Sequence, residues 1–133
     1  MNDIKTFLKK NSSNKVIVVQ GLGFVGSVMS LVCANAINAD YTVIGVDLPN
    51  EYGKKIINAL NNGIFPLSVD DPKIDQFFRK AIKKGNFLAT YDKAAYSYAD
   101  IIIVDINLDV EKNNDSSGTL IDFNVKIQNF HVF

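Results

Sequence analysis

The stretch Lys15–Gly26, KVIVVQGLGFVG, decides the fold. Four consecutive β-branched residues at 16–19 predict a buried strand, and the pattern G-x-G-x-x-G follows almost at once. In a parallel α/β sheet such a strand and turn lead into a helix whose free N–H groups attract the pyrophosphate of a dinucleotide. We expect Gly21 to permit the tight turn, Gly23 to let a diphosphate approach the backbone, and Gly26 to let the helix lie close to the strand.

The residues after the glycines support this interpretation. Apolar side chains recur at helical spacing, and we expect this stripe to pack on the sheet: Val25, Val28, Met29, Val32, Cys33, Ala36 and Ile37. A second strand, Tyr41–Val46, is followed by Asp47, roughly 20 residues beyond Gly26, where an acid accepts hydrogen bonds from the adenosine ribose. Because a carboxylate repels a 2′-phosphate, Asp47 favours NAD over NADP.

Composition is typical of one globular domain. Hydrophobic residues make up 47% and charged residues 21% of the 133 residues. The 14 basic and 14 acidic side chains balance, which argues against nucleic acid as a partner, since its binding needs clustered Lys and Arg. No apolar run reaches the ~18 residues of a membrane span, and the N-terminus lacks the apolar segment of a secretion signal. A single cysteine agrees with a cytoplasmic location.

The first residues differ from the rest of the chain. Residues 1–14 are expected to be an N-terminal extension, with a short helix capped by Asn2 or Asp3. This extension serves either as a strap across the domain or as a contact for a partner. Residues 15–133 are expected to form one dinucleotide-binding domain.

Helices and strands are expected to alternate through the middle of the chain. One helix is expected to end at Asn61-Asn62-Gly63, because glycine favours a left-handed stop. Asp71-Pro72 predicts the start of the next, with an acid at the cap and proline at the first helical position. Gly85 is expected to end it. Strands are expected at Phe87–Thr90 and at 101–104.

The last third of the chain carries weaker patterns. Residues 101–104, Ile-Ile-Ile-Val, are continuously apolar, which is typical of a strand buried on both faces. Polar residues 111–118 predict a loop. The apolar spacing beyond them favours a helix, although Phe123, Val125 and Ile127 also alternate as in a strand. Taken together, the elements predict an α/β fold with a Rossmann-like, doubly wound parallel sheet in a single domain.

A ligand is expected at the carboxyl ends of these parallel strands. Gly21, Asp47 and Asp105 each follow the end of a predicted strand. Asp40 is a rival ribose acid, but it precedes the second strand and is expected at the opposite edge. The residues predicted to contact the dinucleotide are Gly21, Leu22, Gly23, Phe24, Val25, Gly26, Asp47, Val104 and Asp105.

Five stretches share the motifs of one protein family. Gly21–Gly26 fits G-x-G-[YF]-V-G, and Val43–Asp47 fits V-I-G-V-D. Asn61–Leu67, Lys84–Thr90 and Ala99–Val104 are similar to N-x-G followed by [SF]-P-[IL], to S-G-R-L-R-A-T and to A-D-V-I-I-V. In this order they resemble the N-terminal NAD-binding domain of the UDP-glucose/GDP-mannose dehydrogenase family, the nucleotide-sugar 6-dehydrogenases.

The resemblance implies NAD as the cofactor. For a whole enzyme of this family it also implies oxidation of the primary alcohol of a UDP- or GDP-sugar to a uronic acid, a role in polysaccharide biosynthesis, and a homodimer. Two departures stand out: Ile106 replaces a family threonine near the cofactor, and the family's catalytic cysteine, lysine and asparagine motifs are missing. The chain is therefore expected to hold the cofactor, to carry no catalytic residue, and to be inactive by itself.

Two other functions stay open: a non-catalytic dinucleotide-binding or interaction module, and another NAD-dependent dehydrogenase of the hydroxyacid type. Cys33 is expected to be a core residue, because a reactive thiolate needs an electropositive, partly exposed site. His131, the single histidine, has no catalytic motif around it. Asp105 and Asp109 are interpreted as turn residues rather than metal ligands, so no metal is predicted.

Overall fold

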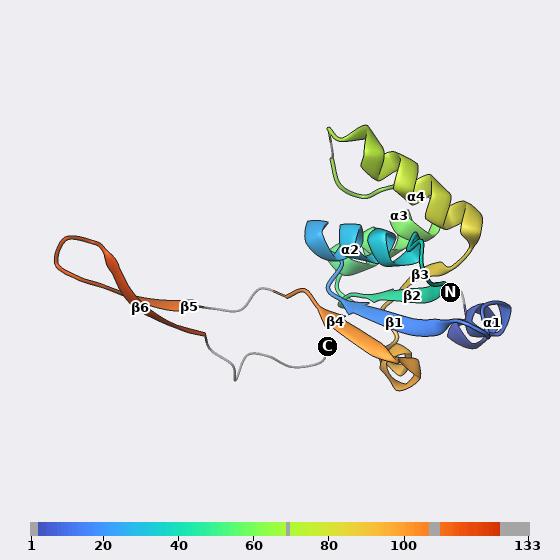
Figure 1. The fold of residues 1–133 in the computed structure, drawn as a ribbon, viewed down its shortest axis with the longest axis horizontal. Coiled ribbons are helices and arrows are strands. Elements are labelled where there is room, and N and C mark those ends of the chain that lie inside the picture. Colours follow the sequence, from blue (N-terminus) through green and yellow to red (C-terminus); the bar gives the residue numbers. More distant parts are fainter. Residues whose placement is uncertain (1–2, 69, 107–109, 126–133) are drawn as a thin grey trace.

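The four-stranded parallel sheet is the centre of the computed structural model, which describes residues 3–68, 70–106 and 110–125 (Figure 1). Its strand order is β3-β2-β1-β4, and every neighbouring pair is parallel. The strands are β1 (Lys15–Gln20), β2 (Tyr41–Val46), β3 (Phe87–Thr90) and β4 (Ile101–Val104). The helices are α1 (Ile4–Lys10), α2 (Phe24–Ala34), α3 (Glu51–Asn61), α4 (Pro72–Lys84) and the 3₁₀ helix η1 (Lys93–Tyr98). The α/β, doubly wound prediction is confirmed.

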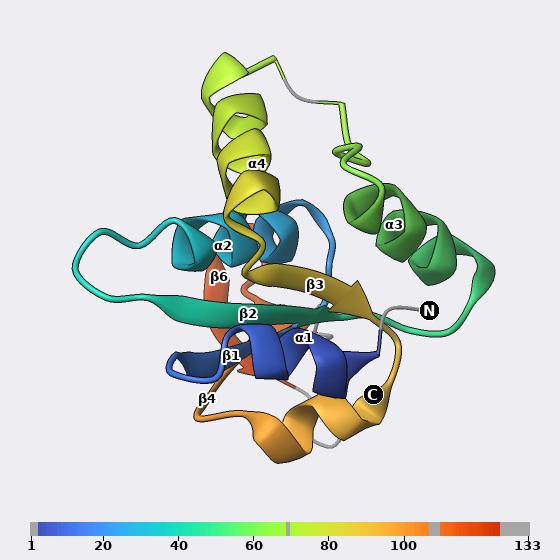
Figure 2. The same cartoon turned by 90° about the vertical axis from the view of Figure 1, so that its right-hand side faces the viewer.

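Helices cover the two faces of the sheet unequally. Because successive strand side chains point to opposite faces, Ile17 and Val19 of β1 join one core cluster, whereas Val18 joins the other. The first cluster is closed by α2, α3 and α4, and the second by α1 and η1. Figure 2 shows α3 and α4 on the opposite side of the sheet from η1.

The N-terminal extension straps the second face. The Asp3 carboxylate caps α1 by accepting the Lys5 N–H at 3.1 Å, as one of the two predicted caps. Ile4 is buried against the sheet. Beyond the helix, the Asn11 side-chain amide donates to the Gly85 carbonyl at 3.3 Å, which ties residues far apart in the chain.

The predicted helix boundaries in the middle of the chain are confirmed. Helix α3 ends at Asn61, and Gly63 follows with a φ of +75°. Asp71 caps α4 by accepting the Lys73 N–H at 2.9 Å, Pro72 is its first residue, and Gly85 ends it with a φ of +72°. These boundaries follow from local backbone chemistry, so the sequence alone predicts them.

The prediction of which face of α2 packs on the sheet is wrong. Val25 and Val32 are more than half exposed, at 57% and 56%. The buried face instead carries small residues with one leucine: Gly26, Ser27, Ser30, Leu31 and Ala34. At its first turn the helix lies so close to the glycine loop that a Cβ on Gly26 would collide with the Gly21 carbonyl oxygen. The two serine hydroxyls donate to backbone carbonyls of Leu22 and Gly26, so they are buried with their hydrogen bonds made.

The two edges of the sheet differ. At β3 the Asn61 side chain brackets Ala89, accepting its N–H at 2.9 Å and donating to its carbonyl at 2.7 Å. At β4 no strand pairs with the outer edge among the described residues. Ile101 and Ile102 are 43% and 46% exposed, so the prediction of burial on both faces is wrong. An apolar run indicates that a strand can be buried. Whether it is buried depends on which other segments pack against it.

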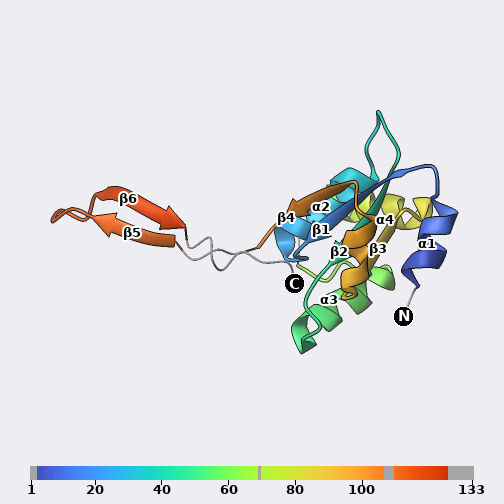
Figure 3. The ribbon, with the colours of Figure 1, turned by 90° about the horizontal axis from the view of Figure 1, so that it is seen from below.

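A separate antiparallel pair follows the sheet, β5 (Val110–Asn114) with β6 (Leu120–Val125) (Figure 3). The prediction of a loop over 111–118 is therefore wrong for 111–114, which belong to β5. The prediction of a helix is wrong over 120–125, and residues 126–133 lie outside the described ranges. The Asp115 carboxylate accepts the Thr119 N–H at 2.9 Å, and Gly118 has a φ of +84°. This turn joins the two strands. Because β6 runs from Leu120 to Val125, the alternative of a strand is correct as far as the described residues go.

Candidate functional site

Three predicted residues meet at the carboxyl edge of the sheet. Gln20 pairs in register with both Val46 and Val104, so the residues that follow these three strand ends are neighbours. The Gly21 N–H donates to the Val46 carbonyl at 2.8 Å, and the Asp105 N–H donates to the Gln20 carbonyl at 2.8 Å. The sheet therefore brings Gly21, Asp47 and Asp105 together, as the sequence predicts.

The three glycines of the loop have different surroundings. Gly21 has a φ of +93°, and a Cβ there would collide with the Asp105 carbonyl oxygen. A Cβ on Gly26 would collide with the Gly21 carbonyl oxygen. Gly23 is exposed, and a Cβ there would meet no atom within 4 Å. Two glycines thus allow close packing, while the third presents bare backbone to open space.

The start of α2 has no side-chain cap. Gly23 occupies the cap position and offers no acceptor, although four other helices each begin with a side chain that accepts a backbone N–H: Asp3, Asn50, Asp71 and Asp92. The first-turn N–H groups of a helix carry partial positive charge, and an anion is a natural acceptor for them. Phe24 and Val25, 50% and 57% exposed, flank this end.

Asp47 points at the glycine loop. Its Oδ2 accepts the Leu22 N–H at 2.8 Å, and its Oδ1 accepts the Leu48 N–H at 2.7 Å. An ionised carboxylate has about four lone-pair sites, so these two bonds orient the group and leave it able to accept ribose hydroxyls. The Leu22 side chain is fully buried, and its role here is to pack under the loop and to hold Asp47 through its backbone.

Sequence reasoning missed a polar pair beneath this site. The Tyr96 hydroxyl, from η1, donates to the Gln20 side-chain carbonyl at 3.1 Å, and Gln20 is almost fully buried. Burial, and secondly the negative charge of Asp47, raise the pKa of Tyr96 to about 12. The available signal was Gln20 itself, a polar residue directly after the apolar run 16–19, but nothing in the sequence indicated its partner.

The raised pKa of Tyr96 predicts a loss of stability in alkali. The unfolded chain releases this proton near the ordinary pKa of 10, whereas the folded chain keeps it until about 12. The contribution is therefore fully present below pH 10 and falls away as the pH rises through 10 to 12. We expect the free energy of unfolding to fall less steeply over this window in Tyr96→Phe than in the wild type, as measured by denaturant titration. If the free energy of unfolding fell equally steeply with pH in the two proteins, this prediction would be contradicted.

The other candidates lie elsewhere or take no part. Asp40 stands before β2 and forms a salt bridge with Lys84 at 2.7 Å, far from the carboxyl edge. Cys33 is half-buried against the core, and burial raises the pKa of its thiol. Over the described ranges there is no cluster of three or more residues able to hold a metal. Asp109 and His131 lie outside those ranges. No described helix has the length and apolar character to cross a bilayer.

Comparison with known proteins identifies the family. The model of the "UDP-glucose/GDP-mannose dehydrogenase family, NAD binding domain" matches residues 15–125. The chain belongs to this family. Its matched part is the NAD-binding domain, and NAD is the cofactor of that domain. Family members are NAD-dependent dehydrogenases, so the resemblance noted in the sequence is confirmed. No match was found among curated proteins.

Solved structures of this family share the fold. NDP-N-acetyl-D-galactosaminuronic acid dehydrogenase of Methanosarcina mazei Go1 is 27% identical with a TM-score of 0.65, over 87% of this chain and 24% of its own. UDP-glucose dehydrogenase of Pyrobaculum islandicum is 21% identical with a TM-score of 0.57, over 70% and 20%. GDP-mannose dehydrogenase of Pseudomonas aeruginosa is 24% identical with a TM-score of 0.53, over 78% and 21%. The chain thus spans only about a quarter or less of these proteins.

Two further residues lie beside the glycine loop. Ile106 lies beside Gly21, with its Cγ2 3.6 Å from the position that a Cβ on Gly21 would take. Val104, at the end of β4, is 37% exposed beside the same loop and completes the predicted residues at this edge.

Proposed function

We propose that this chain holds the cofactor in a nucleotide-sugar 6-dehydrogenase, which oxidises the primary alcohol of a UDP- or GDP-sugar to a uronic acid. The observation that carries the proposal is the uncapped start of α2, where bare Gly23 lies in the same loop as the Leu22 N–H held by Asp47. This arrangement combines an anion site with a carboxylate for ribose, and both belong to one ligand, a dinucleotide.

Each predicted residue has a role in this proposal. The backbone at Gly23 and the first-turn N–H groups bind the pyrophosphate, and Asp47 binds the adenosine ribose. Gly21 and Gly26 shape the loop, and Leu22 holds Asp47. The exposed side chains of Phe24, Val25 and Val104 and the partly buried Asp105 line the site beside the loop. Bound NAD⁺ supplies the hydride acceptor. Two hydride transfers to two NAD⁺, with one water supplying the second carboxylate oxygen and three protons released, convert an alcohol to a carboxylate.

The remaining machinery is proposed to lie in the larger part of the protein that the relatives possess. That part would supply the catalytic residues and the sugar-nucleotide site, in a cytoplasmic homodimer. By itself, the present chain is proposed to bind NAD⁺ weakly and to turn over no substrate.

Calorimetric titration with NAD⁺ tests the cofactor site. Gly23→Val is expected to weaken NAD⁺ binding at least tenfold, because its side chain occupies the space the pyrophosphate needs. Gly23 has a φ of −63° and open space around it, so the fold should tolerate valine. Gly63→Asn serves as the matched control, since that glycine also faces open space and asparagine tolerates its positive φ.

If folded Gly23→Val and the wild type bind NAD⁺ with equal affinity and equal heat, the proposed site has no basis. Binding lost equally in Gly63→Asn would be as damaging, because that residue follows α3 and has no part in the loop.

A second candidate is a dinucleotide-binding module without catalysis. It is favoured by Ile106, whose methyl group stands beside the loop in place of the family hydroxyl. The full-length protein distinguishes the two functions. NADH formed from a UDP- or GDP-sugar supports the enzyme, whereas NAD⁺ binding without turnover of any such sugar supports the module.

A further inference from the structure

Helix η1 lies against both strands that lead into the proposed dinucleotide site. It contacts β1, which continues into the glycine loop, and β2, which ends directly before Asp47. Its buried residue Ala95 and the adjacent Tyr96 pack in the core cluster that contains Val18 and Val46 of these two strands. A side chain of η1 is therefore placed to act on the loop and on the ribose acid together.

A first link joins η1 to the glycine loop. The Tyr96 hydroxyl donates to the Gln20 side-chain carbonyl at 3.1 Å. Gln20 is the last residue of β1 and directly precedes Gly21, and its backbone carbonyl accepts the Asp105 N–H at 2.8 Å. Since Gln20 is only 1% exposed, protein groups hold its polar side chain in place. Tyr96 thereby holds the residue from which the loop departs.

A second link joins η1 to Asp47. The Asp47 N–H donates to the Thr90 carbonyl at 3.1 Å, and the Thr90 hydroxyl accepts the Asp92 N–H at 3.0 Å. Asp92 then caps η1 by accepting the Ala94 N–H at 2.9 Å. Burial is the larger cause of the raised pKa of Tyr96, and the charge of Asp47 is the second, so the two side chains lie near each other.

These links close around the dinucleotide site. The loop also contacts β2 directly, because the Gly21 N–H donates to the Val46 carbonyl and the Leu22 N–H to Asp47. A dinucleotide reaches the loop with its pyrophosphate and Asp47 with its ribose, so its affinity depends on the distance between the two. All of these bonds join residues inside the domain, and they do not depend on what covers its surface in a longer protein.

We propose that Tyr96 is a positioning residue for the dinucleotide: through Gln20 it fixes the start of the glycine loop relative to Asp47, at the spacing that one NAD⁺ needs to reach both. This inference rests on the proposed function, because it concerns the site assigned there to NAD⁺. Tyr96 acts through the Gln20 amide and does not touch the ligand. A ligand that spans the loop and the acid depends on their spacing, whereas a ligand that reaches one of them does not.

Three ligands and the loss of one hydroxyl test the proposal. NAD⁺ spans both parts of the site, adenosine reaches only the ribose acid, and inorganic pyrophosphate reaches only the loop. We follow amide resonances of the whole chain during titration with each ligand. NAD⁺ is expected to bind roughly fivefold more weakly to Tyr96→Phe, while the affinities for adenosine and pyrophosphate stay within about twofold of the wild type. Phenylalanine keeps the ring in the core cluster and removes only the donor.

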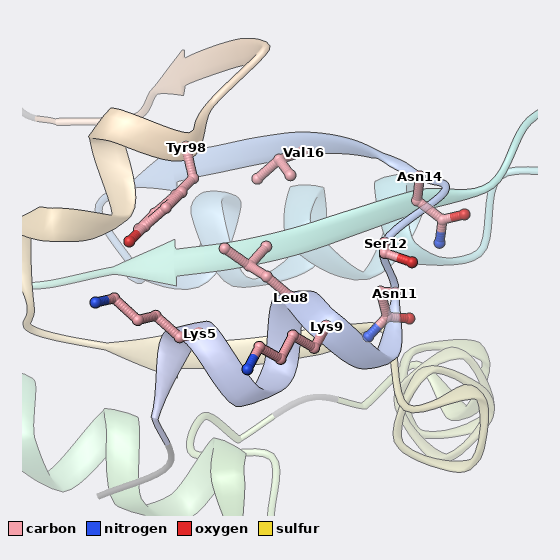
Figure 4. Close-up of a pocket in the computed structure, with 8 residues that line it drawn as sticks. All are labelled: Lys5, Leu8, Lys9, Asn11, Ser12, Asn14, Val16 and Tyr98. Atoms are coloured by element: carbon pink, nitrogen blue, oxygen red, sulfur yellow. The ribbon is translucent and has the colours of Figure 1, made fainter.

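Tyr98→Phe is the matched control, because it removes the same hydroxyl from the same helix two residues further on. Tyr98 lines an open groove of about 470 Å³ between the end of η1, α1 and the start of β1 (Figure 4). This groove includes Val16, near the amino end of β1, whereas Gln20 ends that strand at the dinucleotide site. All three affinities are therefore expected to stay as they are in the wild type.

The route through Gln20 is tested by a double-mutant cycle. Methionine has nearly the length of glutamine but lacks the amide, so Gln20→Met is expected to weaken NAD⁺ binding by itself. Adding Tyr96→Phe to Gln20→Met should then have no further effect on NAD⁺ affinity. A further loss in the double variant as large as the loss in Tyr96→Phe alone would show that the hydroxyl acts by another route, and would overturn the proposal.

Other results would also overturn it. Equal weakening of all three ligands in Tyr96→Phe would indicate a general loosening of the fold, and unchanged NAD⁺ affinity would remove the effect altogether. An equal loss in Tyr98→Phe would be as decisive. A failure of the proposed function looks different, since NAD⁺ would then bind Gly23→Val as well as the wild type, or bind neither. If Gly23→Val loses NAD⁺ binding and Tyr96→Phe does not, the cofactor site stands and only the positioning role fails.

Discussion

Replacing Gly26 with alanine is expected to lower the free energy of unfolding by on the order of 3 kcal/mol, a large part of the ~5–15 kcal/mol that holds a domain together. A Cβ on Gly26 would collide with the Gly21 carbonyl oxygen, which belongs to backbone and cannot rotate away. Either α2 must move off the sheet or the loop must deform. Both changes disturb Gly21, which itself lies so close to Asp105 that a Cβ on it would collide with the Asp105 carbonyl oxygen.

Denaturant titration of Gly26→Ala beside Gly23→Ala measures this effect. The two variants add the same methyl group three residues apart, but at Gly23 it meets no atom within 4 Å. We expect Gly23→Ala to stay within about 0.5 kcal/mol of the wild type, as surface substitutions usually do. If both variants lose equal stability, the close contact between α2 and the loop is not what holds this region.

Asp47→Asn is expected to weaken NAD⁺ binding at least tenfold, about 1.4 kcal/mol. The amide can accept only one of the two N–H groups, from Leu22 and Leu48, that the carboxylate now accepts. The loop at Leu22 then loses its anchor, and the ribose loses a charged acceptor. Because the negative charge is also removed, NADP⁺ should be discriminated against less strongly than in the wild type.

Asp40→Asn is the matched control, because Asp40 precedes the same strand that Asp47 follows. It breaks only an exposed salt bridge with Lys84, so NAD⁺ and NADP⁺ affinities should both stay as they are. Titration of both nucleotides into the two variants decides between the acids. A loss of NAD⁺ binding in Asp40→Asn that Asp47→Asn does not show would reverse their assignment.

Local chemistry made a large part of the fold predictable. The β-branched strand and its glycines, the proline at the start of α4, and the left-handed glycines at 63 and 85 act within a few residues of chain. The order of strands and helices then restricted the fold to a parallel α/β sheet. Since parallel strands end at one edge, the meeting of Gly21, Asp47 and Asp105 also followed.

Long-range packing decided what the patterns could not. The spacing of apolar residues on α2 selected the wrong face: the buried face carries small residues with Leu31, and it begins at Gly26, where the Gly21 carbonyl leaves no room for a side chain. The apolar run of β4 predicted burial, but its exposure depends on neighbours that the strand itself does not encode. The pair of Gln20 with Tyr96 joins residues 76 positions apart, and no local signal connects them.

The sequence by itself determined the backbone elements, the fold class and the loop where a dinucleotide is predicted, because each rests on interactions between residues close in the chain. Only the tertiary structure decided which face of α2 is buried, which edge of the sheet is open, and that the N-terminal extension packs on the same face of the sheet as η1. Those features arise where distant segments compete for the same space, and a pattern of residue types does not specify the outcome of that competition.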